Sequence, residues 1–399
     1  MQSSLRIAMM VYSFYESDTR VRRDAEALVR AGHRVDVICL KQDGPLGDQK
    51  QLNGVRLVKI MGRAYNEMNP FDYLWRLFRF FFHSMVILNR IHVRNRYHVV
   101  HVHSVPDFQI FAAWLPRMTG SKLILDIHDL VPEFYARKFN VTMDHIIVRG
   151  LLKVEKASCC FAHHVITVTD IWKKKLERSV PAHRCMVMMN VPDTTLFNPE
   201  RFKPIRSGRF TLVYPGNLAE HFGVDIALEA VAMLKEKIPS ILFQIVGDGS
   251  QLSYLRQKAE ELALNSHVRF TGHSIPLESV PQWMRNADVG LVPKKGGMFA
   301  DEALSTKLME FAAMELPVVV SETTASKRYF DDQMVRFFRP EDPDDMARAI
   351  YELYRSPSLR RAQIRNAKQF FRFHRWERYK SNYLRLIDTL VGRGRQVTR

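Results

Sequence analysis

Residues 300–320, ADEALSTKLMEFAAMELPVVV, combine a helical pattern with the start of a buried strand. Ser305 is a favourable N-cap residue, and TKLMEFAAM after it is rich in apolar residues that favour a mostly buried helix. Pro317 follows this segment, and the β-branched run PVVVS then predicts a strand. We therefore expect a helix that begins after Ser305 and leads directly into a sheet.

The same strand–helix alternation extends along the whole chain. Buried-strand patterns occur at residues 6–12, 33–40, 55–61, 98–103 and 122–128, and again at 210–216, 241–249, 268–272, 289–293 and 317–321. A helical pattern covers residues 21–31, and other helix-length segments separate the strands. This alternation predicts parallel sheets covered by helices on both faces.

Length and spacing predict two such domains. The chain has 399 residues, which is too long for one ordinary core. The pattern restarts after a Pro- and Arg-rich stretch at residues 197–210. We expect doubly wound α/β domains at residues 1–200 and 201–372, facing each other across a cleft, and a C-terminal helix within 373–399 that crosses back to the first domain.

The composition indicates a reducing cytoplasmic location. No run reaches the roughly 20 apolar residues of a membrane-spanning helix, and the N-terminus lacks a small-residue cleavage site. The four cysteines have no metal-ligand spacing and are too few for a disulfide framework.

The net charge of +17 indicates an anionic partner. Residues 71–96 mix aromatic and aliphatic bulk with arginines, a pattern typical of a helix in a membrane interface. The alternative is a buried helix with basic ends. Since compact nucleic-acid signatures are missing, we expect an anionic membrane surface and no nucleic acid, which places the chain peripherally on the inner face of the cytoplasmic membrane.

Glu302 and Glu310 lie on either side of Lys307. In a continuous helix they would be about 80° apart, so the spacing favours one group in a loop and the other in the second helical turn. The first-turn N–H groups at Thr306, Lys307 and Leu308 suit an anion such as a diphosphate. Glu310 could then accept hydrogen bonds from ribose hydroxyls. The alternative is that both carboxylates only favour the helix start electrostatically.

The sequence resembles the retaining glycosyltransferases of family four, which have the GT-B architecture of two Rossmann-like domains. Glu302 and Glu310 match the family's Glu-x7-Glu motif. The runs DTRVRRDAEALVRAGHRVDVI, HVVHVHS, DIHDLVPE, LVYPGNL, FQIVGDGS, VRFTGH and NADVGLVP follow in the family's order.

The resemblance implies that a sugar passes from a nucleotide diphosphate sugar, with UDP or GDP as the nucleotide, to an acceptor hydroxyl. It also implies retention at the anomeric carbon and neither a metal nor a cofactor. By position, the catalytic candidates are His128 and Glu302, and the acceptor-side candidates are Asp18, Arg20 and His103. The donor-binding candidates are Gly216, Asn217, His221, Gly247, Asp301, Thr306, Lys307, Leu308 and Glu310. A shift of one residue would bring Asp301 rather than Glu302 to the sugar.

The sequence departs from the family at Asn217 and His221, where many members carry Arg and Lys that neutralise the leaving diphosphate. Neutral Asn cannot supply that charge, and histidine does so only when protonated. The expected compensation comes either from the basic residues Lys294, Lys295, Lys307 or Arg20 or from the N–H groups at the start of the donor-side helix.

Three other functions remain open from the sequence. A nucleotide-sugar epimerase or a phosphorylase can share the architecture, and a non-catalytic membrane-associated scaffold could retain the fold. For a transferase, the basic and apolar flank at residues 71–96 suits a lipid-linked or polysaccharide acceptor in cell-surface glycan synthesis.

Overall fold

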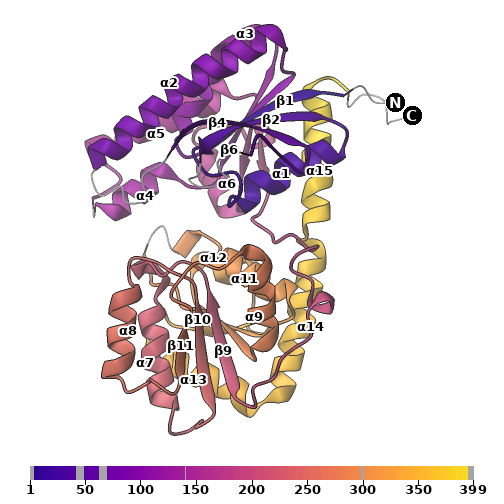
Figure 1. The fold of residues 1–399 in the computed structure, drawn as a ribbon. Coiled ribbons are helices and arrows are strands. Elements are labelled where there is room, and N and C mark those ends of the chain that lie inside the picture. Colours follow the sequence, from indigo (N-terminus) through magenta and orange to yellow (C-terminus); the bar gives the residue numbers. More distant parts are fainter. Residues whose placement is uncertain (1–3, 42–48, 63–69, 140, 298–300, 394–399) are drawn as a thin grey trace. The chain divides into compact units, whose positions relative to one another are not determined.

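The structure is a computed structural model that describes residues 4–41, 49–62, 70–139, 141–297 and 301–393 (Figure 1). The chain divides into two compact units. The N-terminal unit comprises Met1–Met189 together with Glu377–Arg399, and the C-terminal unit comprises Asn190–Trp376.

The N-terminal unit is built on an eight-stranded sheet with the order β3-β4-β2-β1-β5-β6-β7-β8. All neighbouring strands are parallel except β3 and β4, which are antiparallel. The strands are β1 (Arg6–Met10), β2 (Arg34–Lys41), β3 (Gln51–Leu52), β4 (Val55–Gly62), β5 (Val99–His103), β6 (Lys122–Ile127), β7 (His164–Thr167) and β8 (Cys185–Val187). The central strand β1 is almost wholly buried, as a parallel strand covered on both faces must be.

Helices cover both faces of this sheet (Figure 1). They are α1 (Thr19–Arg30), α2 (Pro70–Arg94), α3 (Trp114–Met118), α4 (Val131–Lys138), α5 (Ile146–Phe161), α6 (Asp170–Leu176) and α15 (Trp376–Leu390). Helix α2 packs into the core through Leu77 and Phe80, and the ring of Phe80 meets Tyr12 edge-on at 5.2 Å between centroids.

The C-terminal unit has a six-stranded, wholly parallel sheet with the order β11-β10-β9-β12-β13-β14. Its strands are β9 (Phe210–Pro215), β10 (Ile241–Val246), β11 (Val268–Phe270), β12 (Val289–Val292), β13 (Val318–Ser321) and β14 (Arg336–Phe338). Its helices are α7 (Val224–Leu234), α8 (Leu252–Glu261), α9 (Val280–Asn286), α11 (Thr306–Ala313), α12 (Thr324–Tyr329), α13 (Pro343–Arg355) and α14 (Pro357–Phe373). Helices α7, α8 and α13 cover one face, and α9 and α11 cover the other (Figure 1).

Helix α11 is the one predicted from residues 300–320, and its start and its buried side are confirmed. Ser305 occupies the N-cap position, although its side chain makes no capping hydrogen bond. Phe311 on the buried side packs against Gly290 of β12, where an added Cβ would lie 2.8 Å from the ring. The close packing of helix and strand at this glycine fixes the position of α11 on the sheet.

The predicted alternation of strands and helices, and the parallel sheets it implies, are confirmed. The strands β7, β8 and β14 and the short antiparallel strand β3 were not predicted. Each has only two to four residues, which is too short for a periodic pattern to stand out. Among the described residues, no helix combines the length and apolarity needed to cross a membrane.

Candidate functional site

Two glycine turns form the floor of the candidate donor site, where β9 and β10 end. Gly216 and Gly247 have φ values of 134° and 145°, which side chains rarely allow. A Cβ on Gly247 would lie 2.0 Å from the carbonyl oxygen of Gly216, so the two turns touch through their backbones. Glycine at both positions therefore allows a close approach at this edge of the sheet that a side chain would block.

Lys307 lies directly against the first of these turns. A Cβ on Gly216 would be 2.6 Å from Cε of Lys307 and 3.0 Å from its Nζ. The ammonium also sits over two aromatic rings, 5.0 Å from the Tyr214 centroid and 4.3 Å from that of Phe222. Burial lowers the pKa of Lys307 to about 8, although Glu310 acts in the opposite direction. Among the residues that the structure describes, no carboxylate is hydrogen-bonded to this ammonium, and an anion beside it would favour its protonated form.

The first turn of α11 provides backbone donors beside this lysine. Thr306 is exposed, whereas Leu308 is buried and anchors the turn. The N–H of Leu308 donates to the carbonyl of Ser305 at 3.2 Å. Since the side chain of Ser305 does not cap the helix, the N–H groups at Thr306 and Lys307 suit an anionic ligand.

Glu310 follows Lys307 by one helical turn and is half-buried. Burial raises its pKa to about 7, and the charge of Lys307 only partly offsets this. A carboxyl group in this condition gains from hydrogen-bond donors that favour its ionised form, such as the two hydroxyls of a ribose.

Asp301 and Glu302 lie in helical backbone rather than in a loop, so the predicted loop position of Glu302 is wrong. Both side chains are half-buried. The N–H of Asp301 donates to the carbonyl of Gly297 at 2.9 Å. A non-helical break follows before α11 begins, and the two glutamates therefore belong to separate helical segments.

The other donor-side candidates lie near the glycine turns, with their side chains exposed. Asn217 accepts a hydrogen bond from the hydroxyl of Tyr214 through its backbone carbonyl at 2.8 Å. His221 lies against Phe222 with 4.1 Å between ring centroids. Two of the lysines considered as replacements are already engaged, since Lys294 donates to the carbonyl of Ala303 and Lys295 pairs with Asp225. Lys307 is therefore the best placed of the basic residues in this unit.

In the N-terminal unit, the acceptor-side candidates gather around Asp126, a buried carboxylate of β6. Arg20 of α1 holds both its oxygens, with Nε–Oδ2 at 2.7 Å and Nη2–Oδ1 at 2.9 Å. His103 at the end of β5 brings its Nδ1 within 3.2 Å of the same carboxylate. Burial alone would raise the pKa of Asp126, but Arg20 and His103 hold it well below its usual range. Arg20 therefore neutralises a buried charge of its own unit.

His128 directly follows β6, and its ring centroid lies 6.3 Å from that of His103. Its Nδ1 is buried and has no hydrogen-bond partner among the described residues. The carboxylate of Asp18 caps α1, accepting from the N–H of Val21 at 3.1 Å, and its charge also acts on Arg20. The N-terminal unit thus brings Arg20, His103 and His128 together and leaves Asp18 a helix cap.

Sequence reasoning missed Asp126, His101 and Tyr383. The hydroxyl of Tyr383 on α15 is 2.7 Å from Nδ1 of His101. His101, His103 and Asp126 have ligand atoms within 4.8 Å of one another, as a metal site would. Arg20 already occupies both oxygens of Asp126, however, so these residues fit an ion pair better than a metal. His101 and Asp126 lie within the runs HVVHVHS and DIHDLVPE, which were the local signal for this cluster, whereas Tyr383 lies in neither run.

Comparison with known proteins identifies the family. The "Glycosyl transferase 4-like domain" family matches residues 17–190, and the "Glycosyl transferases group 1" family matches residues 198–370. One chain of the human phosphatidylinositol N-acetylglucosaminyltransferase is 22% identical over 365 residues, covering 87% of this chain and 69% of the human one. The putative colanic acid biosynthesis glycosyltransferase WcaL of Escherichia coli is 29% identical over 39% of this chain. The matched regions cover between 38% and 55% of the length of three bacterial relatives.

Solved structures share the fold over almost the whole chain. Sucrose-phosphate synthase from Thermosynechococcus elongatus has a TM-score of 0.77 at 19% identity, covering 97% of this chain and 99% of that one. HepE of Anabaena, described in complex with UDP, has a TM-score of 0.73 at 14% identity, covering 96% and 100%. The chain belongs to the group 1 glycosyltransferases and has their GT-B fold.

Proposed function

We propose that the protein is a retaining glycosyltransferase that moves a sugar from a UDP- or GDP-sugar to an acceptor hydroxyl without a metal ion. The observation that carries this proposal is the position of Lys307, which lies against the Gly216 turn in the first turn of α11, about one turn before Glu310. Membership in the family favours this reaction over those of an epimerase, a phosphorylase or a scaffold.

The C-terminal unit would hold the nucleoside diphosphate. As the sugar leaves, negative charge builds on the β-phosphate, where Lys307 and the first-turn N–H groups of α11 can stabilise it. An anion beside Lys307 raises the pKa of the lysine and keeps it protonated. One lysine and a helix N-terminus would then replace the charges that Asn217 and His221 do not supply. Glu310 would bind the ribose.

Retention would follow from attack on the face that the diphosphate leaves. The sugar gains oxocarbenium character, which the half-buried carboxylate of Glu302 or of its neighbour Asp301 can stabilise. The departing phosphate oxygen would take the proton of the acceptor hydroxyl. This route needs no covalent intermediate on the protein.

The N-terminal unit would contribute His128, held in place by its neighbours. Asp126 lies 3.2 Å from Nδ1 of His103, and the ring centroid of His103 lies 6.3 Å from that of His128. The buried Nδ1 of His128 is suited to accept or donate one hydrogen bond with a sugar or acceptor hydroxyl. We assign His128 to the substrate and Asp126, His103 and Arg20 to its positioning.

The acceptor would be carried at an anionic membrane surface, on the inner face of the cytoplasmic membrane. Helix α2 supports this because it exposes an apolar stripe in addition to its core-facing side. Trp75, Phe82, Val86 and Val93 are 69%, 55%, 61% and 72% exposed and lie within about 40° of one another around the helix. The exposed Arg79 and Arg90 flank the stripe. A lipid-linked or polysaccharide acceptor fits such a surface, and the human relative is named for a phosphatidylinositol acceptor.

A panel of nucleotide sugars tests this proposal. We expect one UDP- or GDP-sugar to be hydrolysed slowly without an acceptor, in the presence of a chelator, and to release the sugar with its original anomeric configuration. Proton NMR of the first product distinguishes the anomers before mutarotation. Release of the inverted anomer, or a requirement for added metal, would contradict the mechanism.

A further inference from the structure

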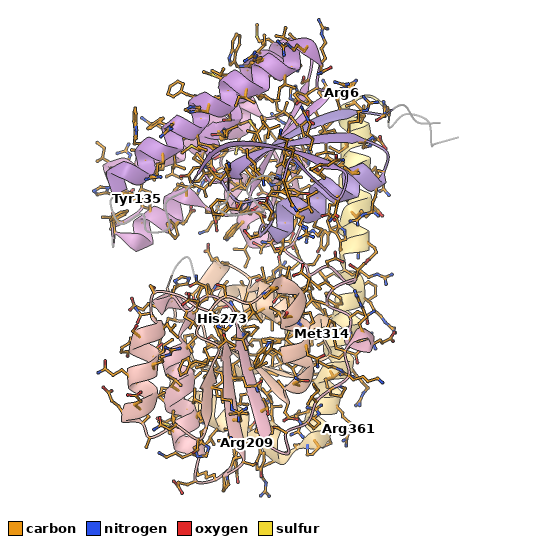
Figure 2. All side chains as sticks on the ribbon, in the orientation of Figure 1. Arg6, Tyr135, Arg209, His273, Met314 and Arg361 are labelled. Atoms are coloured by element: carbon orange, nitrogen blue, oxygen red, sulfur yellow. The ribbon has the colours of Figure 1, made fainter. Side chains whose placement is uncertain are left out.

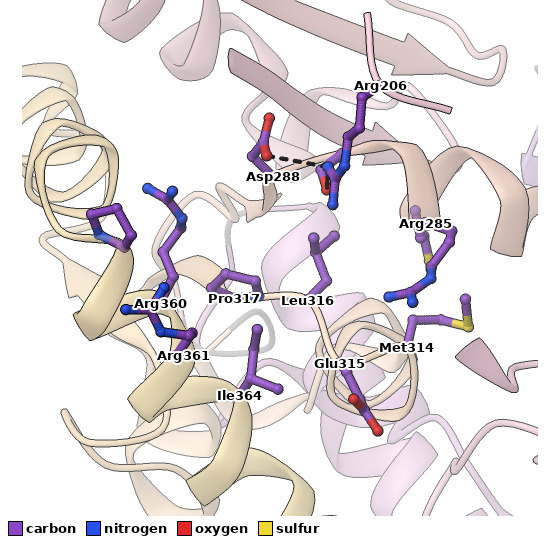
Figure 3. Close-up of a pocket in the computed structure, with 13 residues that line it drawn as sticks. Arg206, Arg285, Asp288, Met314, Glu315, Leu316, Pro317, Arg360, Arg361 and Ile364 are labelled. Carbon is purple, nitrogen blue, oxygen red and sulfur yellow. Dashed lines mark hydrogen bonds and ion pairs between the residues drawn. The ribbon is translucent and has the colours of Figure 1, made fainter. Parts of the chain in front are cut away.

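A second cavity of about 240 Å³ lies in the C-terminal unit, between Asp288 and Pro317 (Figure 3). These two residues immediately precede β12 and β13, so the cavity lies at the amino ends of the strands. The glycine turns and Lys307 lie at their carboxyl ends. In Figure 2, Arg209 at the start of β9 and His273 after β11 mark these two ends, and Arg361 lies toward the end with Arg209. The cavity is therefore separate from the candidate donor site.

Four arginines from three segments line this cavity. Arg206 comes from the chain before β9, Arg285 from α9, and Arg360 and Arg361 from the first turn of α14. Figure 3 shows Arg360 and Arg361 on one side of Pro317 and Leu316, and Arg206 and Arg285 on the other. Four guanidinium groups thus surround one small space.

The two carboxylates of the lining are already paired. Asp288 forms an ion pair with Arg206, with 3.2 Å between Oδ1 and Nη1, and its Oδ2 accepts a hydrogen bond from the N–H of Thr211 at 2.9 Å. Glu315 pairs with Lys368. Because the four arginines of the lining outnumber its two carboxylates, Asp288 and Glu315, the positive charge of the cavity exceeds its negative charge.

Backbone carbonyls accept hydrogen bonds from two of the other guanidinium groups. Arg285 donates through Nε to the carbonyl of Phe202 at 3.2 Å, and Arg360 donates through Nη1 to the carbonyl of Tyr354 at 3.2 Å. Burial lowers the pKa of Arg360, the charge of Asp288 acts in the opposite direction, and the charges of Arg361 and Arg206 act in the same direction as burial. Among the described residues, Arg361 has no hydrogen-bond partner. Its five donors are therefore open to a ligand.

The floor of the cavity is apolar. Met284, Met314 and Leu316 are buried beneath the arginines, and such a floor strengthens charge interactions above it because it excludes water. A guanidinium group can donate two parallel N–H···O hydrogen bonds to two oxygens of one phosphate group. A water molecule or a chloride ion cannot accept such a pair. The volume accommodates a phosphate group with several water molecules, each of which takes about 30 Å³.

We propose that this cavity binds a phosphate group of a ligand other than the sugar donor. Its source is either a soluble phosphorylated metabolite or the headgroup of an anionic phospholipid, since both present the same chemistry to the arginines. The proposal does not depend on the reaction assigned to the other end of the sheet.

Arginine-specific modification of the wild-type chain tests this at the resolution of single residues. Phenylglyoxal reacts with accessible guanidinium groups, and peptide mass spectrometry follows Arg285 and Arg361 separately from Arg269 and Arg355. The last two are exposed arginines of the same unit outside the cavity, so they serve as controls. With saturating UDP present throughout, the reaction is compared in inorganic phosphate, in chloride at equal ionic strength, and with vesicles of phosphatidylglycerol or of phosphatidylcholine.

We expect Arg285 and Arg361 to react several-fold more slowly with an anionic ligand, while the controls change little. Protection by inorganic phosphate assigns a soluble ligand, and protection by phosphatidylglycerol vesicles alone assigns a headgroup. The proposal is overturned if neither addition slows Arg285 and Arg361 more than Arg269 and Arg355.

A pair of double variants supplies an independent measurement. Calorimetric binding of the protecting ligand should be lost in Arg285→Ala/Arg361→Ala and kept in Arg269→Ala/Arg355→Ala, which removes the same charge. Equal binding by both variants would overturn the site. Because the modification experiment uses the unaltered protein, a folding defect in a variant leaves the test intact.

Discussion

Burial shifts the pKa values of Lys307 and Glu310 toward neutral pH. Burial lowers the pKa of Lys307 to about 8 and raises that of Glu310 to about 7. A diphosphate needs the protonated lysine, whereas a ribose held by two hydroxyl donors needs the ionised carboxylate. Both conditions are met best between these two values.

We therefore predict that the affinity for UDP or GDP is greatest between about pH 7 and 8. Above this window Lys307 loses its proton, and below it Glu310 gains one, so affinity falls on both sides. Calorimetric titration from acid to alkaline pH measures the profile. Lys307→Arg should extend binding to higher pH because arginine stays charged.

Two groups contribute to the fall in nucleotide affinity at low pH, namely Glu310 and the terminal phosphate of the nucleotide, which ionises near pH 6. Glu310→Gln should remove the contribution of Glu310 and leave that of the phosphate. A flat profile, or an alkaline limb unchanged by Lys307→Arg, would contradict the roles of both residues.

His128 is the residue of the N-terminal unit that we assign to the substrate. We predict that His128→Ala lowers turnover by about 100-fold or more, the usual contribution of a positioned proton donor or acceptor, with little change in donor affinity. Steady-state kinetics and nucleotide titration separate the two effects. His183→Ala, an exposed histidine of the same unit, should alter neither. Equal losses of turnover and nucleotide affinity would instead make His128 part of the donor site.

At the level of elements, α2 has two apolar sides. One side packs in the core through Leu77 and Phe80, and the other exposes the stripe that begins at Trp75. A helix that only covers the core of its own unit needs the core-facing side but not an exposed apolar stripe. The stripe with its flanking arginines is what an interfacial helix requires.

We predict that the protein binds vesicles containing anionic lipid and that Trp75→Ser/Phe82→Ser weakens binding at least about tenfold, since each buried aromatic side chain contributes about 1.5–3 kcal/mol. Cosedimentation measures the effect. Binding should also weaken with salt and on replacing Arg79 and Arg90.

The control is Ile146→Ser/Met233→Ser, which removes two exposed apolar side chains outside α2. Equal loss in this control, or no binding to anionic vesicles at low salt, would contradict the membrane role.

Helix α15 is anchored to the N-terminal sheet by Tyr383, which is fully buried against His101. We predict that Tyr383→Phe lowers the free energy of unfolding of this unit by about 1–2 kcal/mol, because it leaves a buried ring nitrogen without its partner. Urea denaturation measures the change. Tyr254→Phe removes an exposed hydroxyl and should be neutral within about 0.5 kcal/mol. A neutral Tyr383→Phe would show that packing alone anchors α15.

For the whole molecule, local patterns were enough to predict the two parallel sheets. The β-branched runs correspond to β1, β2, β4, β5 and β6 and to β9 through β13. The helix after Ser305 was predictable for the same reason, since its apolar spacing is local. The contact between Lys307 and the Gly216 turn was not predictable, because these residues are far apart in the sequence.

The polar clusters lie beyond local patterns altogether. Arg20 and Asp126 are 106 positions apart, and His101 and Tyr383 are 282 apart. The arginines of the second cavity come from three segments that only the folded sheet brings together. Sequence patterns identify such residues one at a time, whereas tertiary packing determines which of them meet.

We propose that α11 and the glycine turns form a nucleotide site in which Glu310 holds the ribose. Calorimetric titration of UDP and GDP into the wild type, Glu310→Ala and Glu236→Ala measures this role, and Glu236 serves as the control because it is an exposed glutamate of the same unit. We predict that the wild type binds one of the nucleotides, that Glu310→Ala weakens it about tenfold or more, as the loss of hydrogen bonds to a charged group requires, and that Glu236→Ala binds normally. Undiminished binding by Glu310→Ala, or no binding of either nucleotide to the wild type, would contradict the account.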